Sequence, residues 1–576
     1  MAIHESPTLK RFKSLFAQLD NERQSFIAHW KDLADFVLPR RARFTISDNN
    51  KGTRINHKII DATATLASRT LQSGMMAGLT SPARPWFRLT LPDQDLAELG
   101  AVKRWLHIVT QRMNAIFLRS NLYNTLPTVY GDMGNFGTAC FYIEEDSDKV
   151  FRTYPFPVGS YYLGNDDQGR IRVFMREFRF TVRQLVMKFG SVDENGKPVW
   201  DNFSSTIKER WDQNKTEEWI EVIHGVIPNP NHDPAMSAPK FKRYLDVYYE
   251  KSVKGKSSEE TDAKNVFLRE SGHDFFPILA PRWEVTDGDV YGTNCPGMTA
   301  LGDTKQLQNE QKRKSQAVEK GVNPAMKGPT ALRAVKHSIL PGDMTYTDER
   351  EGMKGFEPVH KVTLSIKDLT DDIREVKQMI SRAYYEDLFL MLTRTDRREI
   401  TATEVDERKE EKLLALGPVL EQTNQDMLDP LIDIVYDIMD SQGMIPQPPE
   451  ELDGQELKVE YISVMAQSQK LLGINSLERF TQFSGEIAKI TGDRRAFYKV
   501  NWAQIIDDHG DRSGVSPSII RSDEEVEELV AQELEAQKQV AQLEKVQAAA
   551  SVAKDLSAAS LEEDSALKRL LKPQAA

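Results

Sequence analysis

Thr401-Ala-Thr-Glu-Val-Asp-Glu-Arg-Lys409, continued by Leu416-Gly-Pro-Val-Leu420 and Leu431-Ile-Asp-Ile-Val-Tyr-Asp-Ile-Met439, decides how this chain folds. Its large side chains recur three or four positions apart, which places them on one face of a helix. This stripe consists of Leu413, Leu416, Leu420, Thr423, Met427, Leu431, Ile434 and Ile438. Thr401 and Glu404 have the spacing of a capping box, so the helix is predicted to begin there. A helix over the whole stretch would be ~60 Å long at 1.5 Å per residue, which is too long for one compact core.

Gly417, Pro418 and Pro430 lie inside this predicted helix. Each proline lacks the backbone N–H that a helix uses, so the helix is predicted to change direction at these positions.

The composition indicates a large chain of several domains. Its 576 residues suffice for about three or four domains, and 40% of them are hydrophobic. Only two cysteines, Cys140 and Cys295, are present, which argues against a disulfide framework or a zinc cluster. The start of the chain has no signal-peptide pattern, and no stretch of 18 apolar residues predicts a membrane span. The net charge of −12 argues against wrapping nucleic acid by bulk attraction.

The periodicity predicts an α+β fold that is mainly helical. Helices are expected at 8–37, 57–76, 101–130 and 181–189. Between 137 and 290 short apolar runs alternate with Gly, Asn and Asp turns, which predicts a mostly antiparallel sheet. These runs are Thr138–Ile143, Phe151–Pro155, Tyr161–Leu163, Arg170–Phe178, Trp219–Ile227 and Arg243–Glu250.

The predicted helix at 299–320 is polar nearly all round, with Leu301, Leu307 and Val318 as its only large apolar residues. A monomer core holds such a helix poorly, so it is expected to bridge domains or line a wet passage. An irregular module follows, and a clear apolar stripe then predicts a helix from 366 to about 392.

No motif indicates catalysis. Gly255-Lys256-Ser257 ends like a phosphate-binding loop, but Glu250 stands where the first glycine is required. Asp507-Asp508-His509-Gly-Asp511 offers ligands for a hard cation, yet it reads more simply as a polar turn at a helix end. Neither a metal-protease spacing nor a nucleophile elbow is present, so no catalytic residue, metal or cofactor is expected.

Two groups of basic residues are candidates for contact with nucleic acid: Arg394, Arg397 and Arg398 in a tight turn, and Lys305, Lys312, Arg313 and Lys314 on the polar helix. Arginine forks suit phosphate oxygens, but these arginines could equally pair with nearby carboxylates, and the lysines could simply be solvated. Without interleaved aromatic residues or a recognition helix, any contact would be with the DNA backbone and not with the base sequence.

Four blocks in order resemble the head-to-tail connector, or portal, proteins of short-tailed bacteriophages. They are Thr70–Leu89, Asn135–Glu144, Thr401–Arg408 together with 416–420 and 428–431, and Gly514–Val526. The resemblance extends over nearly the whole chain. It implies a ring of twelve subunits at one capsid vertex, assembled in the bacterial cytoplasm, with a central channel for double-stranded DNA.

The resemblance also implies a division of the chain into named parts. The wing would be 1–295 with 400–458, the stem 296–323 and 366–392, the clip 324–365, the tunnel loop 393–399, the crown 459–521, and a C-terminal helix or barrel 522–576. Expected partners are further copies of the chain, the terminase motor, tail adaptor proteins, and the major capsid and scaffolding proteins.

Two other classes of protein remain open at this stage. A DNA-packaging enzyme would need a phosphate loop and an acidic metal pair, and neither is convincing here. A structural tail or scaffold protein that never meets DNA would need neither feature.

Overall fold

The computed structural model describes residues 7–44, 54–192, 198–251, 267–328, 366–393, 416–463, 480–487, 500–513 and 523–559, apart from a few isolated positions, and also Glu357–Pro358. The chain divides into two compact units. The first contains Met1–Arg88, Val109–Pro446 and Val459–Leu472, and the second contains Leu89–Ile108, Gln447–Lys458 and Gly473–Ala576.

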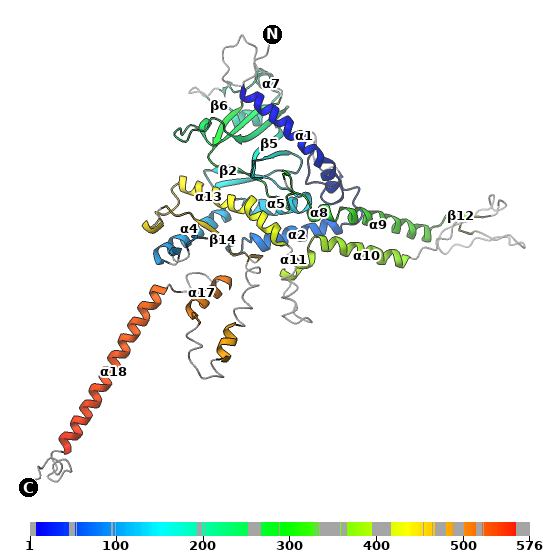
Figure 1. The fold of residues 1–576 in the computed structure, drawn as a ribbon. Helices are drawn as coiled ribbons and strands as arrows, with labels where there is room; N and C mark the ends of the chain where they lie inside the picture. The colour runs from blue at the N-terminus through cyan, green and yellow to red at the C-terminus, as the bar shows by residue number, and fades with distance from the viewer. Residues whose placement is uncertain are drawn as a thin grey trace, which may run out of the picture. The chain divides into compact units, whose positions relative to one another are not determined.

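A five-stranded antiparallel sheet forms the centre of the first unit (Figure 1). Its order is β10-β9-β8-β5-β4, with β4 at Tyr161–Asn165, β5 at Ile171–Thr181, β8 at Trp219–Pro228, β9 at Tyr244–Glu250 and β10 at Arg269–His273. A three-stranded antiparallel sheet has the order β11-β2-β3, with bounds Ile278–Leu279, Phe141–Asp146 and Val150–Pro155. The short strands β6 (Ser191–Val192) and β7 (Pro198–Val199) pair separately. The prediction of a mostly antiparallel sheet region is confirmed.

Helix α1 (Pro7–Phe36) confirms the helix predicted at 8–37, and it packs on one side of the large sheet. Its Leu9, Phe12 and Leu19 share an apolar cluster with alternate residues of β5, β8 and β9. Gly225 of β8 leaves room for the Phe12 ring, because a Cβ there would lie 2.6 Å from it. The alternation of side chains along each strand therefore assigns one face of the sheet to α1.

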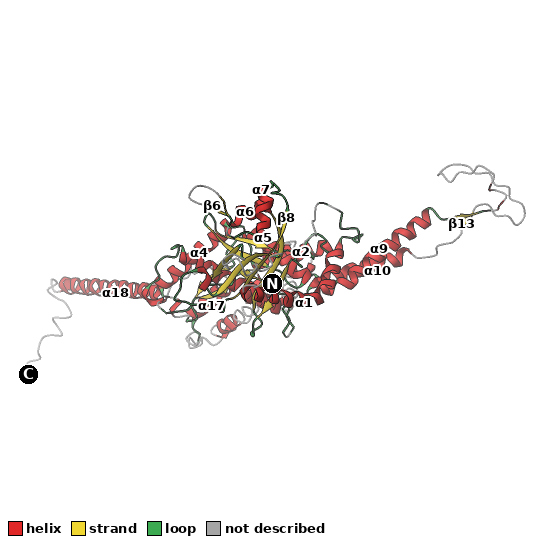
Figure 2. Ribbon diagram, turned by 90° about the horizontal axis from the view of Figure 1, so that it is seen from above, coloured by secondary structure: helices red, strands yellow, loops and turns green. Residues whose placement is uncertain are grey.

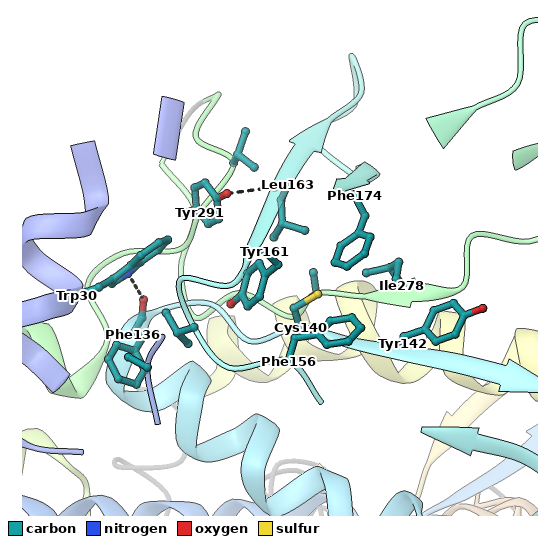
Figure 3. Close-up of a cluster of buried hydrophobic side chains, with 14 of the residues drawn as sticks. Trp30, Phe136, Cys140, Tyr142, Phe156, Tyr161, Leu163, Phe174, Ile278 and Tyr291 are labelled. Atoms are coloured by element: carbon teal, nitrogen blue, oxygen red, sulfur yellow. Dashed lines mark hydrogen bonds between the residues drawn. The ribbon is translucent and has the colours of Figure 1, made fainter. Parts of the chain in front are cut away.

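The opposite face carries two apolar clusters. One is formed with α6 (Val182–Phe189) and α7 (Ser205–Asp212). Thr181 and Gln184 close a capping box at the start of α6, and this confirms the predicted short helix. The other cluster joins the two sheets and the end of α1 (Figure 3). Within it the Trp30 Nε1–H donates to the Phe136 carbonyl at 3.0 Å, and the Leu163 N–H donates to the Tyr291 hydroxyl at 3.0 Å.

The helical part of the first unit is built around α2 (Thr63–Leu79) and α5 (Leu122–Phe136), which pack along each other. Small residues permit this close approach. A Cβ on Gly134 of α5 would lie 2.3 Å from Leu71 of α2. Gly74 of α2 leaves room for a different neighbour, the Phe389 ring, because a Cβ there would lie 2.1 Å from it.

Two predicted helix boundaries are wrong. The helix predicted at 57–76 begins only at Thr63, and the residues before it form turns. The Asp61 side chain accepts the Thr63 N–H, which favours a helix start at this position. The single helix expected at 101–130 is two helices, α4 (Gly100–Arg119) and α5, separated at Ser120 and Asn121. At this break the Ser120 hydroxyl donates to the Phe117 carbonyl, and the Asn121 amide donates to the Thr153 carbonyl of β3.

The decisive stretch is helical from Leu416 to Ser441, and its earlier part, including Leu413, lies outside the described residues. All seven stripe residues from Leu416 to Ile438 are buried, as predicted. A π-helical turn, η3 (Asn424–Leu428), precedes α13 (Asp429–Ser441). The Asp429 N–H reaches back to the Asn424 carbonyl, and Pro430 then has no N–H to donate. The change of direction at Gly417, Pro418 and Pro430 stays a prediction.

The second unit includes two helices of the C-terminal region, α17 (Trp502–Ser513) and α18 (Asp523–Ala559). The C-terminal helix that the sequence predicted is present as α18. Its exposed apolar side chains, between 43% and 66% accessible, are Val526, Leu529, Val530, Leu534, Val540, Leu543, Val546 and Val552. Other short elements are η1 (Pro239–Phe241), which lies in the first unit, and β1 (Phe87–Thr90), η4 (Glu450–Leu452) and β14 (Lys458–Tyr461).

Candidate nucleic-acid interface

Two helices, α9 (Leu301–Val322) and α10 (Ile366–Ala383), run side by side in both views (Figures 1 and 2). The short α8 (Pro296–Thr299) leads into α9. Beyond α9, β12 (Met326–Lys327) pairs antiparallel with β13 (Glu357–Pro358), which precedes α10. The chain thus runs out along one helix, passes through a paired strand segment, and returns along the other.

Helix α10 is anchored by apolar packing. Ile373, Val376 and Ile380 are buried, as their spacing predicted. The Tyr384 hydroxyl donates to Asn135 Oδ1 at 2.9 Å. Tyr385 then adopts a φ of 54°, so the expected single helix to about 392 is divided into α10 and α11 (Glu386–Thr393). A residue in the left-handed region cannot continue a right-handed helix.

Helix α9 is polar and largely uncovered. Its buried residues are Thr304, Leu307, Gln308 and Glu310, all in its first half. From Gln311 to Val322 no side chain is buried, and Val322 is 82% exposed. The sequence predicted such a helix from its lack of large apolar residues, and its outer half is exposed or half-buried in the described chain.

The structure separates the four basic candidates on α9. The Lys305 ammonium pairs with Asp32 of α1 at 2.6 Å and lies 5.5 Å from the Phe36 ring centre. Lys312 and Arg313 are exposed and form no ion pair with any residue that the structure describes, and Lys314 is half-buried. Arg394, Arg397 and Arg398 lie outside the described residues and directly follow the end of α11 at Thr393.

One buried polar network was not foreseen. Across β8, β9 and β10, His224 Nε2 lies 2.8 Å and His273 Nε2 3.1 Å from the two oxygens of Asp246. Burial alone would raise the pKa of Asp246, but the two imidazoles outweigh it and the pKa is lowered. Burial lowers the pKa of His224. Strand alternation could have indicated that these side chains share a face, but not that their strands are neighbours.

A second buried ion pair joins the decisive helix to the sheets. Arg282 is 3% exposed and donates from Nε (2.9 Å) and Nη2 (3.0 Å) to the two oxygens of Asp426, which lies in the π turn. Its backbone N–H adds a third bond at 3.2 Å. No sequence pattern marked this pair, because 144 positions separate the two residues.

Cys140 and Cys295 are both buried, and burial raises the pKa of each thiol. Within the described ranges there is no group of three or more His, Cys, Asp or Glu side chains placed to hold a metal ion. Among those same residues, no helix has the length and apolar character needed to span a membrane.

The first unit thus combines a packed α+β body with a helix pair whose α9 member is polar and exposed along its outer half. The chain belongs to the bacteriophage head to tail connecting protein family, whose model matches residues 9–520. It is 46% identical over 559 residues to the portal protein of Salmonella phage epsilon15, covering 97% of both chains. It is 40% identical over 517 residues to a probable portal protein of Bordetella phage BPP-1, covering 90% of this chain and 89% of the relative.

Proposed function

We propose that this chain is a phage portal protein: copies of it form a ring at one capsid vertex, and double-stranded DNA passes through the central channel during packaging and ejection. The observation that carries this proposal is the 46% identity to a portal protein over 97% of both chains. The ring, of twelve subunits by the family resemblance, would also serve as a platform for the terminase motor and the tail adaptor. The major capsid and scaffolding proteins would surround it.

The parts of the chain have proposed roles in this ring. Helices α8 and α9 with α10 and α11 would form the stem, and the segment that contains β12 and β13 would form the clip. The sheets, the helices before residue 296 and residues 400–458 would form the wing. Residues 393–399 would be the tunnel loop, 459–521 the crown, and α18 part of a C-terminal barrel.

A closed ring explains why α9 is uncovered in one chain. In a head-to-tail ring each subunit presents a different surface to each neighbour, so the polar outer half of α9 can be covered by the next copy. Lys312 and Arg313, which are exposed and unpaired among the described residues, would recur around the axis. With a net charge of −12 on each chain, such cationic rings would be isolated, so DNA would slide past them instead of being held by dense phosphate pairing.

Copy number in the virion tests the location and stoichiometry. Quantitative mass spectrometry of purified virions, with isotope-labelled peptides of this chain and of the major capsid protein, should give twelve copies of this chain per particle. Complete absence from virions, or copies as numerous as those of the capsid protein, would contradict a portal. The capsid protein peptides serve as the internal standard for intact particles.

A further inference from the structure

The helix pair meets the rest of the first unit at one carboxylate, that of Asp61. Its Oδ1 accepts the Thr63 N–H at 2.9 Å and the Thr63 hydroxyl at 2.5 Å, which fixes it at the start of α2. Its Oδ2 lies 2.7 Å from the Lys377 ammonium of α10 and accepts from Gln311 Nε2 of α9 at 2.8 Å. One side chain therefore contacts three helices.

The backbone of Ile60 and Asp61 is also bonded to α9. Gln308 of α9 is buried, and its Oε1 accepts the N–H groups of Ile60 and Asp61 at 2.6 Å and 2.8 Å. Its Nε2 donates to the Asp61 carbonyl at 3.0 Å. The amide thus bonds to the peptide groups on both sides of Asp61 and holds them in one orientation.

The two helices of the pair are attached by different means. Helix α10 is anchored by the burial of Ile373, Val376 and Ile380. Apolar burial has no directional requirement. Of the four buried side chains of α9 only Leu307 is apolar, and Glu310 Oε2 and Thr304 Oγ1 have no hydrogen-bond partner among the described residues. Hydrogen bonds depend steeply on angle, so polar contacts fix the direction of α9 more than apolar packing does.

We infer that Asp61 is a positioning residue that sets the direction in which the α9–α10 pair leaves the body of the subunit. The carboxylate can satisfy Thr63, Gln311 and Lys377 together only when all three helices hold their present orientation. Hydrogen bonds to an ionised group are roughly twice as strong as neutral ones, so loss of the charge weakens both outward links. The Asp61 pKa agrees with an ionised group: burial raises it, but Lys377 and Thr63 outweigh burial and the pKa is lowered.

The consequence for DNA passage rests on the proposed function. In a ring, the direction of this pair in every copy would define the width of the stem. The orientation of the pair within one subunit can be measured whether or not the ring exists.

Pulsed electron–electron distance measurement on the full-length chain tests the inference. Spin labels at Gln24→Cys on α1 and Lys320→Cys near the end of α9 use exposed positions, and the two native cysteines are buried. Labelled chains are diluted with unlabelled chains so that only distances within one chain are detected. In the wild-type chain the distance between the two labels should have one narrow distribution. In Asp61→Asn and in Lys377→Met this distribution should become broad.

The double variant should be no broader than Asp61→Asn alone, because Lys377→Met removes a link that Asp61→Asn has already broken. Lys305→Met is the matched control: it removes the ion pair between α9 and Asp32 of α1, which is more exposed than the Asp61–Lys377 pair, and it should retain the narrow distance. Asn can still accept at the start of α2, so Asp61→Asn should keep the wild-type circular dichroism spectrum. A narrow distance in Asp61→Asn, or equal broadening in Lys305→Met, would overturn the inference. Imaging the unlabelled protein for rings tests the proposed function separately.

Discussion

An Asp426→Ala variant is expected to lower the opening free energy of α13 by about 3–5 kcal/mol, because it leaves the buried Arg282 guanidinium without its carboxylate. Arg282 would keep a bond to the Gly169 carbonyl, but that neutral acceptor does not compensate its charge. Gln422 would lose its bond to Asp426 Oδ2 as well. The π turn would then lose its ion pair with the segment that follows β11.

Native-state hydrogen exchange at the α13 amides measures this effect without assuming that the whole chain unfolds in one step. Gln425→Ala is the matched control, since Gln425 lies in the same turn but bonds only to the exposed Glu421. A double variant, Arg282→Met with Asp426→Leu, should recover most of the loss because it removes both charges together. A change below about 1 kcal/mol in Asp426→Ala, within the range of an exposed ion pair, would refute the structural role given to this contact.

Replacing Arg394, Arg397 and Arg398 with glutamine is expected to leave rings intact and reduce packaged DNA by at least about tenfold, the factor that about 1.4 kcal/mol produces. Repetition around a ring would turn three arginines per chain into a cationic band. Each phosphate contact that is lost lowers the affinity for DNA, and it also makes that affinity less dependent on salt concentration. The measurement is the yield of DNA-filled capsids, and the DNA retained in them, when only the variant chain is supplied.

The control for this variant is a change of similar charge elsewhere. Arg183→Gln with Lys208→Gln removes two exposed cations of α6 and α7, and should package at the wild-type level. Variant rings of normal appearance that package and retain DNA like the wild type would exclude the three arginines as DNA contacts. Failure to form rings at all would instead assign these residues to assembly, and would also contradict the prediction.

Local periodicity predicted much of the fold. The buried stripe of the decisive helix, the paired strands, α1 and the capped α6 each follow from a repeat within one segment, and each is present. The interruptions within the predicted helices were missed, because they depend on the backbone conformation of single residues, which the spacing of apolar residues does not indicate. Tyr385 takes a left-handed conformation, and the turn before Pro430 adds one residue to the helical repeat.

The contacts that determine how the segments fit together were not predictable. Gln308 bonds to residues about 250 positions away, and Gly74 is required by the ring of Phe389. Such contacts join segments whose own patterns are complete without them, so one sequence has no signal for them. For the same reason the sequence could not show which basic residues of α9 are paired. Nothing in the α9 sequence distinguishes Lys305, which pairs with Asp32, from the exposed Lys312.

The central claim is that copies of this chain close into a ring around a channel. Negative-stain electron microscopy of the purified protein, with averaging of end-on views, tests it most directly. The portal assignment predicts closed rings with an axial hole, twelvefold in symmetry. Fibres, sheets or only monomers at the concentrations used for assembly would contradict it.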